Sequence, residues 1–212
     1  PMPGTFEQND DQEPDFLSNY MYMYAEASIT DGTAFLLFEH IPATFRFKIS
    51  NKRPEPARIN SVKVTVVDTE GVEQPVASQY VDVLAASDED IELSYSTISY
   101  TEVTTNINAS LATDEKYTAY ALVLPLYGNA PLEGKKIRFT IDASNPDNEY
   151  LSFELDAETL ANANHGEYNW VGGKSYTINM RLGDVLYFES ITVEDWKDGG
   201  TIDAGEAEDM TW

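Results

Sequence analysis

The chain has 212 residues, 42% of them hydrophobic, and a formal net charge of −24 at pH 7. The length supports one large or two small domains. The charge argues against binding to nucleic acid or to anionic lipid, because both need clustered Lys and Arg. There is no apolar run of about 18 residues that would predict a transmembrane helix, and the absence of cysteine fits an exported bacterial protein as well as a cytosolic one.

The N-terminal third begins with a segment that we expect to be partly disordered. Residues 1–15 are rich in Asn, Asp, Gln, Pro and Glu, which leaves little to bury, and they do not form a signal peptide. The first strand is expected within residues 16–28, where Met and Tyr alternate, and a short apolar strand follows at 34–38.

The clearest pair of strands lies at residues 45–49 and 62–66. Phe45, Phe47 and Ile49 alternate with basic residues, and so do Val62, Val64 and Val66. Six of the thirteen basic residues fall in this region: Arg46, Lys48, Lys52, Arg53, Arg58 and Lys63. We therefore expect one sheet face to carry most of the positive charge. It is interpreted either as a solvated face or as a docking patch for an acidic partner, including the acidic tail of another copy.

The middle of the chain mixes short strands with polar connections. Strands are expected at 81–84 and 91–95, around an acidic loop at 87–90. Residues 96–116 are rich in Ser, Thr and Asn and are interpreted as a long loop or a weak edge region. Residues 117–127 are apolar on both faces and predict a central buried strand, although Pro125 cannot donate to a ladder.

Two hairpins are predicted in the last third. Residues 137–141 and 151–155 alternate around a turn at 145–148, and one or two helical turns are expected at 157–165. The second hairpin, residues 170–196, turns at Gly183–Asp184. Its alternation slips by one residue at Glu189–Ser190, which predicts a bulge or a bend. About ten short strands with close turns predict an all-β, antiparallel sandwich with little helix. The predicted core residues are Phe47, Val64, Phe139, Phe153, Tyr176 and Ile178.

No motif in the sequence predicts catalysis. His40 and His165 are the two histidines, and neither has a second ligand at metal spacing. Residues 172–175 (GGKS) resemble the end of a P-loop, but residue 168, where the earlier glycine would stand, is Tyr, and the flanking strand and helix are missing. We assign no catalytic, cofactor-binding or metal-binding residue and do not expect an enzyme.

Acidic loops and exposed aromatics leave two further ligand classes open. Calcium could bind only at loops that lack the EF-hand pattern, so ordinary solvated turns are favoured. These loops are Asp88–Asp90, Asp142 with Asp147, and Glu194–Asp195 with Asp198. The thirteen Tyr and three Trp allow a glycan-binding face, although most tyrosines in a sandwich are expected to pack in cores and along edges.

Two stretches of the chain resemble the fimbrillin-like proteins of the Bacteroidetes, the type V pilin superfamily. Residues 38–47 (FEHIPATFRF) and 58–64 (RINSVKV) are similar to the family's entry strand and the strand after it. Residues 173–179 (GKSYTIN) and 191–196 (ITVEDW) are similar to its closing strands. The resemblance implies a transthyretin-like β-sandwich, export as a lipoprotein, display at the outer membrane, and a role in fimbriae or adhesion.

The resemblance also suggests how the chain is divided. Residues 33–196 are the predicted sandwich domain, residues 197–212 an acidic, Gly-containing tail, and residues 1–32 the remnant of a preceding β domain. The favoured function is a fimbrial subunit or fimbrillin-like adhesin that assembles by β-strand addition. Its partners would be other fimbrial subunits or surface ligands. The alternative is a glycan-binding module of a surface polysaccharide-use system. We expect no cofactor and a monomer in dilute solution, with any self-association through the termini.

Overall fold

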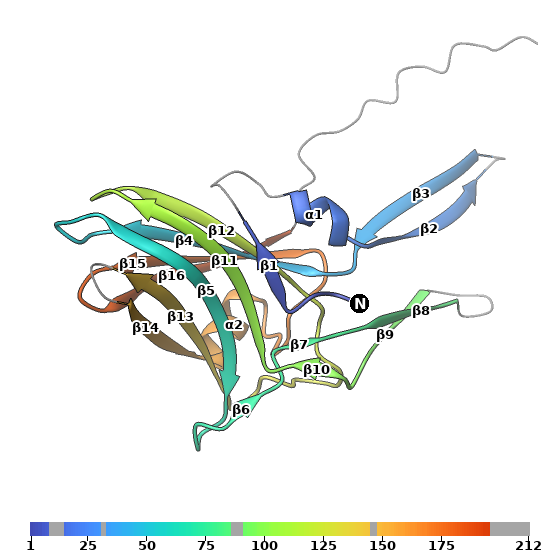
Figure 1. The fold of residues 1–212 in the computed structure, drawn as a ribbon. Helices are drawn as coiled ribbons and strands as arrows, with labels where there is room; N and C mark the ends of the chain where they lie inside the picture. The colour runs from blue at the N-terminus through green and yellow to red at the C-terminus, as the bar shows by residue number, and fades with distance from the viewer. Residues whose placement is uncertain (9–14, 31–32, 86–90, 145–147, 196–212) are drawn as a thin grey trace, which may run out of the picture.

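The computed structural model describes residues 1–8, 15–30, 33–85, 91–144 and 148–195, and in these ranges most of the chain is β-strand (Figure 1). The strands are β1 (Thr5–Glu7), β2 (Met23–Thr30), β3 (Thr33–His40), β4 (Ala43–Asn51), β5 (Ala57–Val67), β6 (Glu73–Gln74), β7 (Ala77–Ser78), β8 (Val81–Ala85), β9 (Ile91–Tyr95), β10 (Ser99–Tyr100), β11 (Glu102–Leu111), β12 (Lys116–Val123), β13 (Lys136–Ser144), β14 (Asn148–Asp156), β15 (Lys174–Leu182) and β16 (Leu186–Asp195). The helices are α1 (Asp15–Tyr20) and α2 (Ala157–Ala163). Neither helix is long and apolar enough to cross a membrane.

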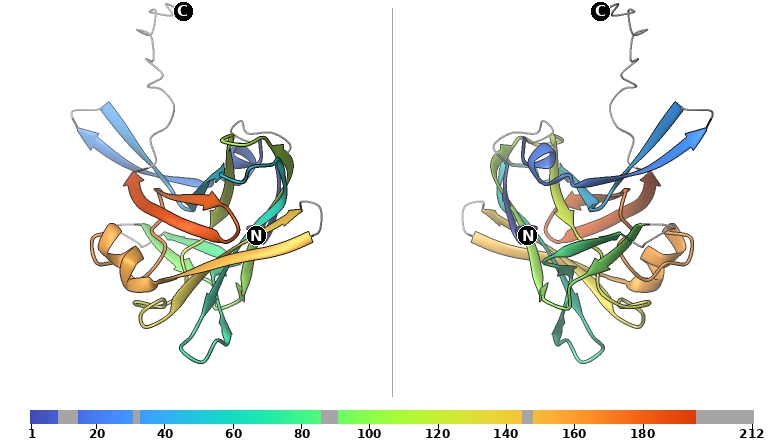
Figure 2. Two further views of the ribbon diagram at one scale, coloured as in Figure 1. Left: turned by 90° about the vertical axis from the view of Figure 1, so that its left-hand side faces the viewer. Right: turned by 90° about the vertical axis from the view of Figure 1, so that its right-hand side faces the viewer.

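Two sheets pack face to face. The large sheet has the strand order β1-β11-β5-β13-β14, with β6 added to β5, and the small sheet has the order β12-β4-β15-β16. Most neighbours are antiparallel, but β1 runs parallel to β11 and β15 runs parallel to β4. Helix α2 packs at one side of the sandwich, against β14 and β16 (Figure 2). The predicted all-β sandwich with little helix is confirmed.

The core between the sheets is built from the alternating strands. Phe47 of the small sheet contacts Phe139 of the large sheet edge to face, with ring centroids 6.2 Å apart. Phe139 stacks on its cross-strand partner Phe153 at 5.1 Å. Five of the six predicted core residues are fully buried, and Phe153 is half-buried against them because β14 is the edge strand. The alternation therefore assigned the inward faces correctly.

One end of the core is closed by Trp170. Its indole N–H donates to the carbonyl oxygen of Val76 at 2.6 Å, and its ring lies 4.8 Å from that of Phe45. The Tyr176 hydroxyl oxygen accepts a hydrogen bond from the Val171 N–H at 2.8 Å. Burial raises the pKa of Tyr176, because the phenolate would lose its hydration. The aromatic end of the sandwich thus has each of these polar atoms paired.

The final hairpin has the predicted bulge. Asn179 pairs with Ser190, but the next residue, Met180, pairs with Phe188, so Glu189 is the extra residue of β16. The bulge restores the alternation that the sequence loses at this point, and both halves of β16 turn their apolar side chains inward.

Three local predictions were wrong. Residues 1–8 are ordered: β1 pairs with β11, and Met2 and Phe6 are buried in the main core. The start of the expected strand at 16–28 is helix α1, and the strand begins at Met23. Residues 102–111, expected in a long loop or a weak edge region, form β11 between β1 and β5. Thr and Val suit a pleated, half-buried surface, so this polar stretch is a strand after all. The division of the chain at residues 32 and 196 stays a prediction.

Strand β12 is buried, as predicted, but it is not central. It forms the edge of the small sheet, and its residues 119–123 are buried on both faces. Strand β11 packs beside it and helix α1 contacts it. Pro125 follows the end of the strand, so it removes no donor from the ladder.

Candidate functional site

Two hairpins project from the same end of the sandwich. Strands β2 and β3 form one two-stranded sheet, and β8 and β9 form the other. Figure 1 shows both extending away from the main sheets, and no other strand of the described residues pairs with either. A two-stranded hairpin is only marginally stable alone in water, and its backbone edges are open to pairing. This end of the molecule is therefore a candidate interaction site.

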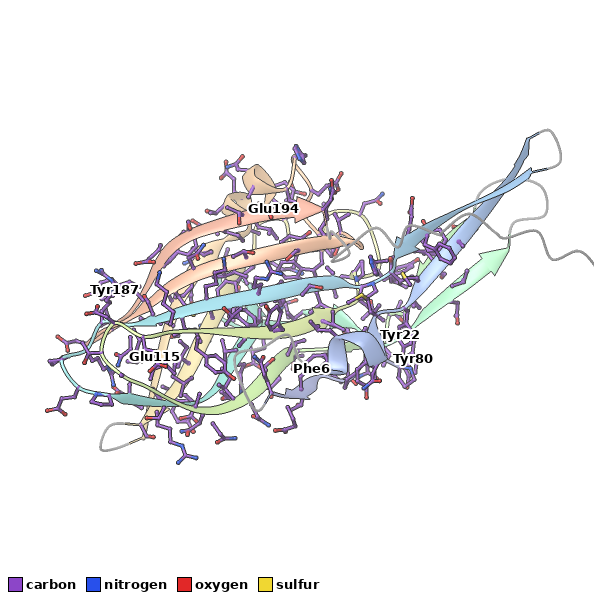
Figure 3. All side chains as sticks on the ribbon, turned by 90° about the horizontal axis from the view of Figure 1, so that it is seen from above. Phe6, Tyr22, Tyr80, Glu115, Tyr187 and Glu194 are labelled. Carbon is purple, nitrogen blue, oxygen red and sulfur yellow. The ribbon has the colours of Figure 1, made fainter. Side chains whose placement is uncertain are left out.

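A cavity of about 460 Å³ opens between the bases of these hairpins. Its lining combines Met2 of the N-terminal segment with the start of β2, the start of β8 and Leu124. Tyr22 and Tyr80 line it and lie close together in Figure 3. Large apolar side chains here are exposed: Tyr22 38%, Met23 49%, Tyr80 44% and Val83 49%. Asp82 and Gln79 supply polar groups. An apolar wall with a few polar groups is the ordinary form of a ligand site.

The N-terminal segment seals the neighbouring edge of the small sheet. The Gln8 side chain donates through Nε2 to the carbonyl oxygen of Thr118 at 2.7 Å and accepts through Oε1 from the N–H of Tyr120 at 3.0 Å. Phe6 is buried two residues earlier. One side-chain amide thus takes the place of a neighbouring strand along β12. This contact could not be predicted from the sequence, because a single Gln within a polar stretch belongs to no recognisable pattern.

The two histidines do not come together. His40 ends β3, half-buried, opposite Met23. His165 is exposed in the turn after α2, with a φ of 56°. Within the ranges that the structure describes, no group of three or more His, Cys, Asp or Glu could hold a metal ion. Neither histidine is therefore part of a described metal cluster.

The glycines of the P-loop-like stretch have a packing role. A Cβ on Gly172 would stand 2.5 Å from the carbonyl oxygen of Ile41, and Gly173 has a φ of +72° and donates to the carbonyl oxygen of Pro42. Lys174 opens strand β15 and pairs with Asp195. No helix follows, so these glycines let the loop approach residues 40–42 and do not cradle a phosphate.

The acidic loops are described only in part. Asp88–Asp90, Asp147 and Asp198 lie outside the described residues. Asp142 accepts a hydrogen bond from the Asn60 side-chain amide at 3.1 Å. Glu194 is exposed near the end of β16, opposite Ser175 (Figure 3). Neither of these carboxylates belongs to a described group of three or more side chains that could hold a metal ion.

The prediction of one basic sheet face was wrong. Arg46 and Lys48 lie on the outer face of the small sheet, whereas Arg58 and Lys63 belong to β5 of the large sheet. The two groups face away from each other because β4 and β5 turn their apolar residues toward the same core. Within the described ranges, three of the six cations form ion pairs: Lys52 with Asp114, Arg53 with Glu149, and Lys63 with Glu102.

The model of the fimbrillin-like family matches residues 4–196, which span both sheets and both hairpins. The chain belongs to this family. None of the curated protein sequences matches the chain. Most of the motif residues that suggested this family lie in β3, β4, β5, β15 and β16, and Trp196 lies outside the described residues. The strand residues build the scaffold of the fold.

Solved structures that resemble the chain are distant in sequence. One is described as a cell adhesion protein from Bacteroides uniformis, with 16% identity, a TM-score of 0.43, and coverage of 76% of this chain and 53% of that one. A fimbrial protein from Bacteroides vulgatus has 10% identity, a TM-score of 0.41, and coverage of 76% and 56%. The tip fimbrial protein Mfa3 from Porphyromonas gingivalis has 12% identity, a TM-score of 0.37, and coverage of 78% and 55%. The chain thus spans little more than half the length of these proteins.

Proposed function

We propose that this chain is a structural or adhesive protein of the cell surface, a fimbrial subunit or fimbrillin-like adhesin that is exported and held at the outer membrane. Its membership of the fimbrillin-like family supports this role. The observation that carries assembly by strand addition is strand β1. It has three residues, occupies the edge of the large sheet and buries Phe6, and Gln8 seals the edge of β12 beside it. A segment so short can leave and be replaced by another chain.

The test compares chains that lack one terminal segment. The full chain should be a monomer by light scattering in dilute solution, and association should require residues 1–15 or 197–212. A chain that lacks residues 1–8 should bind a synthetic peptide of residues 1–8, since the vacated edge offers main-chain hydrogen bonds and a pocket for Phe6. The matched control peptide carries Phe6→Asp and should not bind. A stable oligomer that survives both truncations would instead favour face-to-face contact of sandwiches.

A glycan-binding module is the second candidate. The cavity between the hairpins supports it, because Tyr22 and Tyr80 present aromatic surface beside Asp82 and Gln79. An array of immobilised saccharides tests it. A saccharide bound by the full chain and lost in Tyr80→Ala, but kept in Tyr150→Ala, would place this function above assembly. Tyr150 is a suitable control because it is 73% exposed and outside the cavity.

A structural role predicts no catalysis. In the described part of the chain the two histidines are apart, the GGKS stretch packs against residues 40–42, and no group of three or more His, Cys, Asp or Glu could hold a metal ion. Hydrolysis of model esters, glycosides or peptides by the purified chain would overturn this expectation.

A further inference from the structure

Four basic side chains gather on the outer face of the small sheet. Arg46 and Lys48 stand two residues apart on β4, so they share a face. Ser50, next on the same face, lies between Lys116 of β12 and Arg181 of β15. Neighbours across a ladder and along its diagonal lie within about 4.5–8 Å. The basic face, defined as Arg46, Lys48, Lys116 and Arg181, is therefore one continuous patch.

Among the described residues, no carboxylate forms an ion pair with any of these four cations. The ion pairs of the described residues use other cations: Lys52, Arg53, Lys63, Lys136, Arg138 and Lys174. Arg46 lies over the ring of Tyr120 and Arg181 over that of Tyr187, at 5.6 and 4.5 Å. The Nε atoms of both arginines are buried and have no hydrogen-bond partner among the described residues. A buried donor without an acceptor is costly. Such cations are unexpected in a chain with 37 acidic and 13 basic residues.

A cavity of about 340 Å³ opens on the same face. Lys48 and Lys116 line this cavity together with Thr118 and Asn179. Thr118 adds a hydroxyl group and Asn179 an amide donor. Glu189, the bulge residue, is the single carboxylate among the lining residues. The face therefore offers cations, a hollow and polar groups to an incoming anionic segment.

We propose that the basic face binds the acidic C-terminal segment of the same chain, residues 197–212. This segment contains five carboxylate side chains and one Lys. It follows β16, which is the edge strand of the small sheet and ends at Asp195, beside Lys174. The 17 residues after Asp195 can span up to roughly 56 Å, and the ten residues of β16 rise about 33 Å. The segment is long enough to run back along the sheet to Lys48 and Lys116.

The tether explains why this segment is favoured over a separate polyanion. The net charge of −24 repels any acidic molecule that approaches from solution. A segment joined to the sheet has an effective concentration in the millimolar range and does not pay this association cost. The contact is independent of the proposed fimbrial role, because it requires neither another subunit nor a cell surface.

Disulfide trapping tests the contact, because the chain has no cysteine. In the full chain, Asn179→Cys with Glu208→Cys should form an intramolecular disulfide at least tenfold faster than Thr140→Cys with Glu208→Cys. Thr140 is also half-buried in mid-strand, but it lies on the outer face of the large sheet, opposite Lys63 and Ser152. Equal rates for the two pairs would overturn the proposal.

Charge reversal shows whether the basic face causes the contact. Lys48→Glu with Lys116→Glu should slow the Asn179–Glu208 cross-link to the control rate, and so should about 0.5 M salt, which shortens the screening length. Arg58→Glu with Lys63→Glu changes the net charge equally on the other sheet and should leave the rate unchanged. If the disulfide formed only between two chains, the intramolecular contact would be wrong, and the basic face would bind the C-terminal segment of a second copy. If heparin bound the full chain and displaced the C-terminal segment, the basic face would instead be a binding site for a sulfated polysaccharide.

Discussion

The side chain of Gln8 binds the backbone of Tyr120 as a neighbouring strand would. Its Oε1 accepts the Tyr120 N–H at 3.0 Å, and its Nε2 donates to the carbonyl oxygen two residues earlier at 2.7 Å. Gln8 is 2% exposed, so neither backbone group has water as a ready substitute. The relationship ties the N-terminal segment to the small sheet, while β1 ties it to the large one.

We expect Gln8→Ala to lower the free energy of unfolding by about 1–3 kcal/mol, because it leaves a buried N–H and C=O unpaired. Urea denaturation measures the change. Glu7→Ala is the control. The Glu7 side chain is exposed, and among the described residues it accepts a hydrogen bond only from the Asn106 side chain. Removing it should therefore cost less than about 0.5 kcal/mol of unfolding free energy. Equal effects at both positions would contradict an edge seal at Gln8.

Phe139 tests the core. It is 1% exposed and contacts Phe47 across the sandwich and Phe153 across the hairpin. Phe139→Ala should cost roughly 3–5 kcal/mol, through lost burial and the cavity that remains. Tyr150→Ala, on the adjacent strand β14 but 73% exposed, should cost under about 0.5 kcal/mol. A loss below about 1 kcal/mol at Phe139 would mean that the assigned strand faces are wrong.

The sequence predicted well which face of each strand is buried, but it predicted poorly which strands pair with one another. Alternation at Phe139 and Tyr176 identified inward positions because a strand turns every second residue to one side. It could not assign a strand to a sheet, so Arg46 and Lys63 were placed on one face although they lie on opposite sides of the sandwich. Pairing of β4 with β15, about 130 residues later, is a long-range outcome of packing.

The binding surfaces were harder to predict for the same reason. Tyr22 and Tyr80 line the same cavity because two hairpins start at one end of the sandwich. Polar strand β11 was missed because its Thr, Asn and Ser residues resemble a loop composition. The bulge at Glu189, in contrast, was visible as a slip in parity, since a bulge must displace the pattern by one residue.

The Gly172 position should not accept a side chain. A Cβ there would lie 2.5 Å from the carbonyl oxygen of Ile41, a backbone atom that cannot move aside alone. We expect Gly172→Ala to destabilise the chain by about 1–3 kcal/mol through overpacking. Ser175→Ala, three residues later, removes a buried hydroxyl that has no partner among the described residues and should cost little. Thermal unfolding midpoints of the two variants test this expectation. Similar midpoints would show that the loop does not depend on the close approach of Gly172 to Ile41.

The stability of the chain should fall in alkaline solution, in part because of Tyr176. Burial raises the pKa of this phenol above its ordinary value of 10.0, so the folded state keeps a proton that the unfolded state releases. Its stabilising contribution is therefore complete below pH 10 and is lost as the pH rises from 10 toward the folded pKa. Tyr176→Phe removes the titrating group, and the decline of unfolding free energy above pH 10 should become shallower.

The comparison must use the slope with pH and not the absolute stability. Tyr176→Phe also removes the acceptor of the Val171 N–H, which lowers stability at every pH. Urea titrations at several values between pH 8 and 11 separate the two effects, because the lost hydrogen bond gives a constant offset and the lost proton linkage changes the gradient. Tyr127→Phe is the matched control, since Tyr127 is 63% exposed, and it should follow the wild-type profile. A Tyr176→Phe profile parallel to that of the wild type would contradict the linkage.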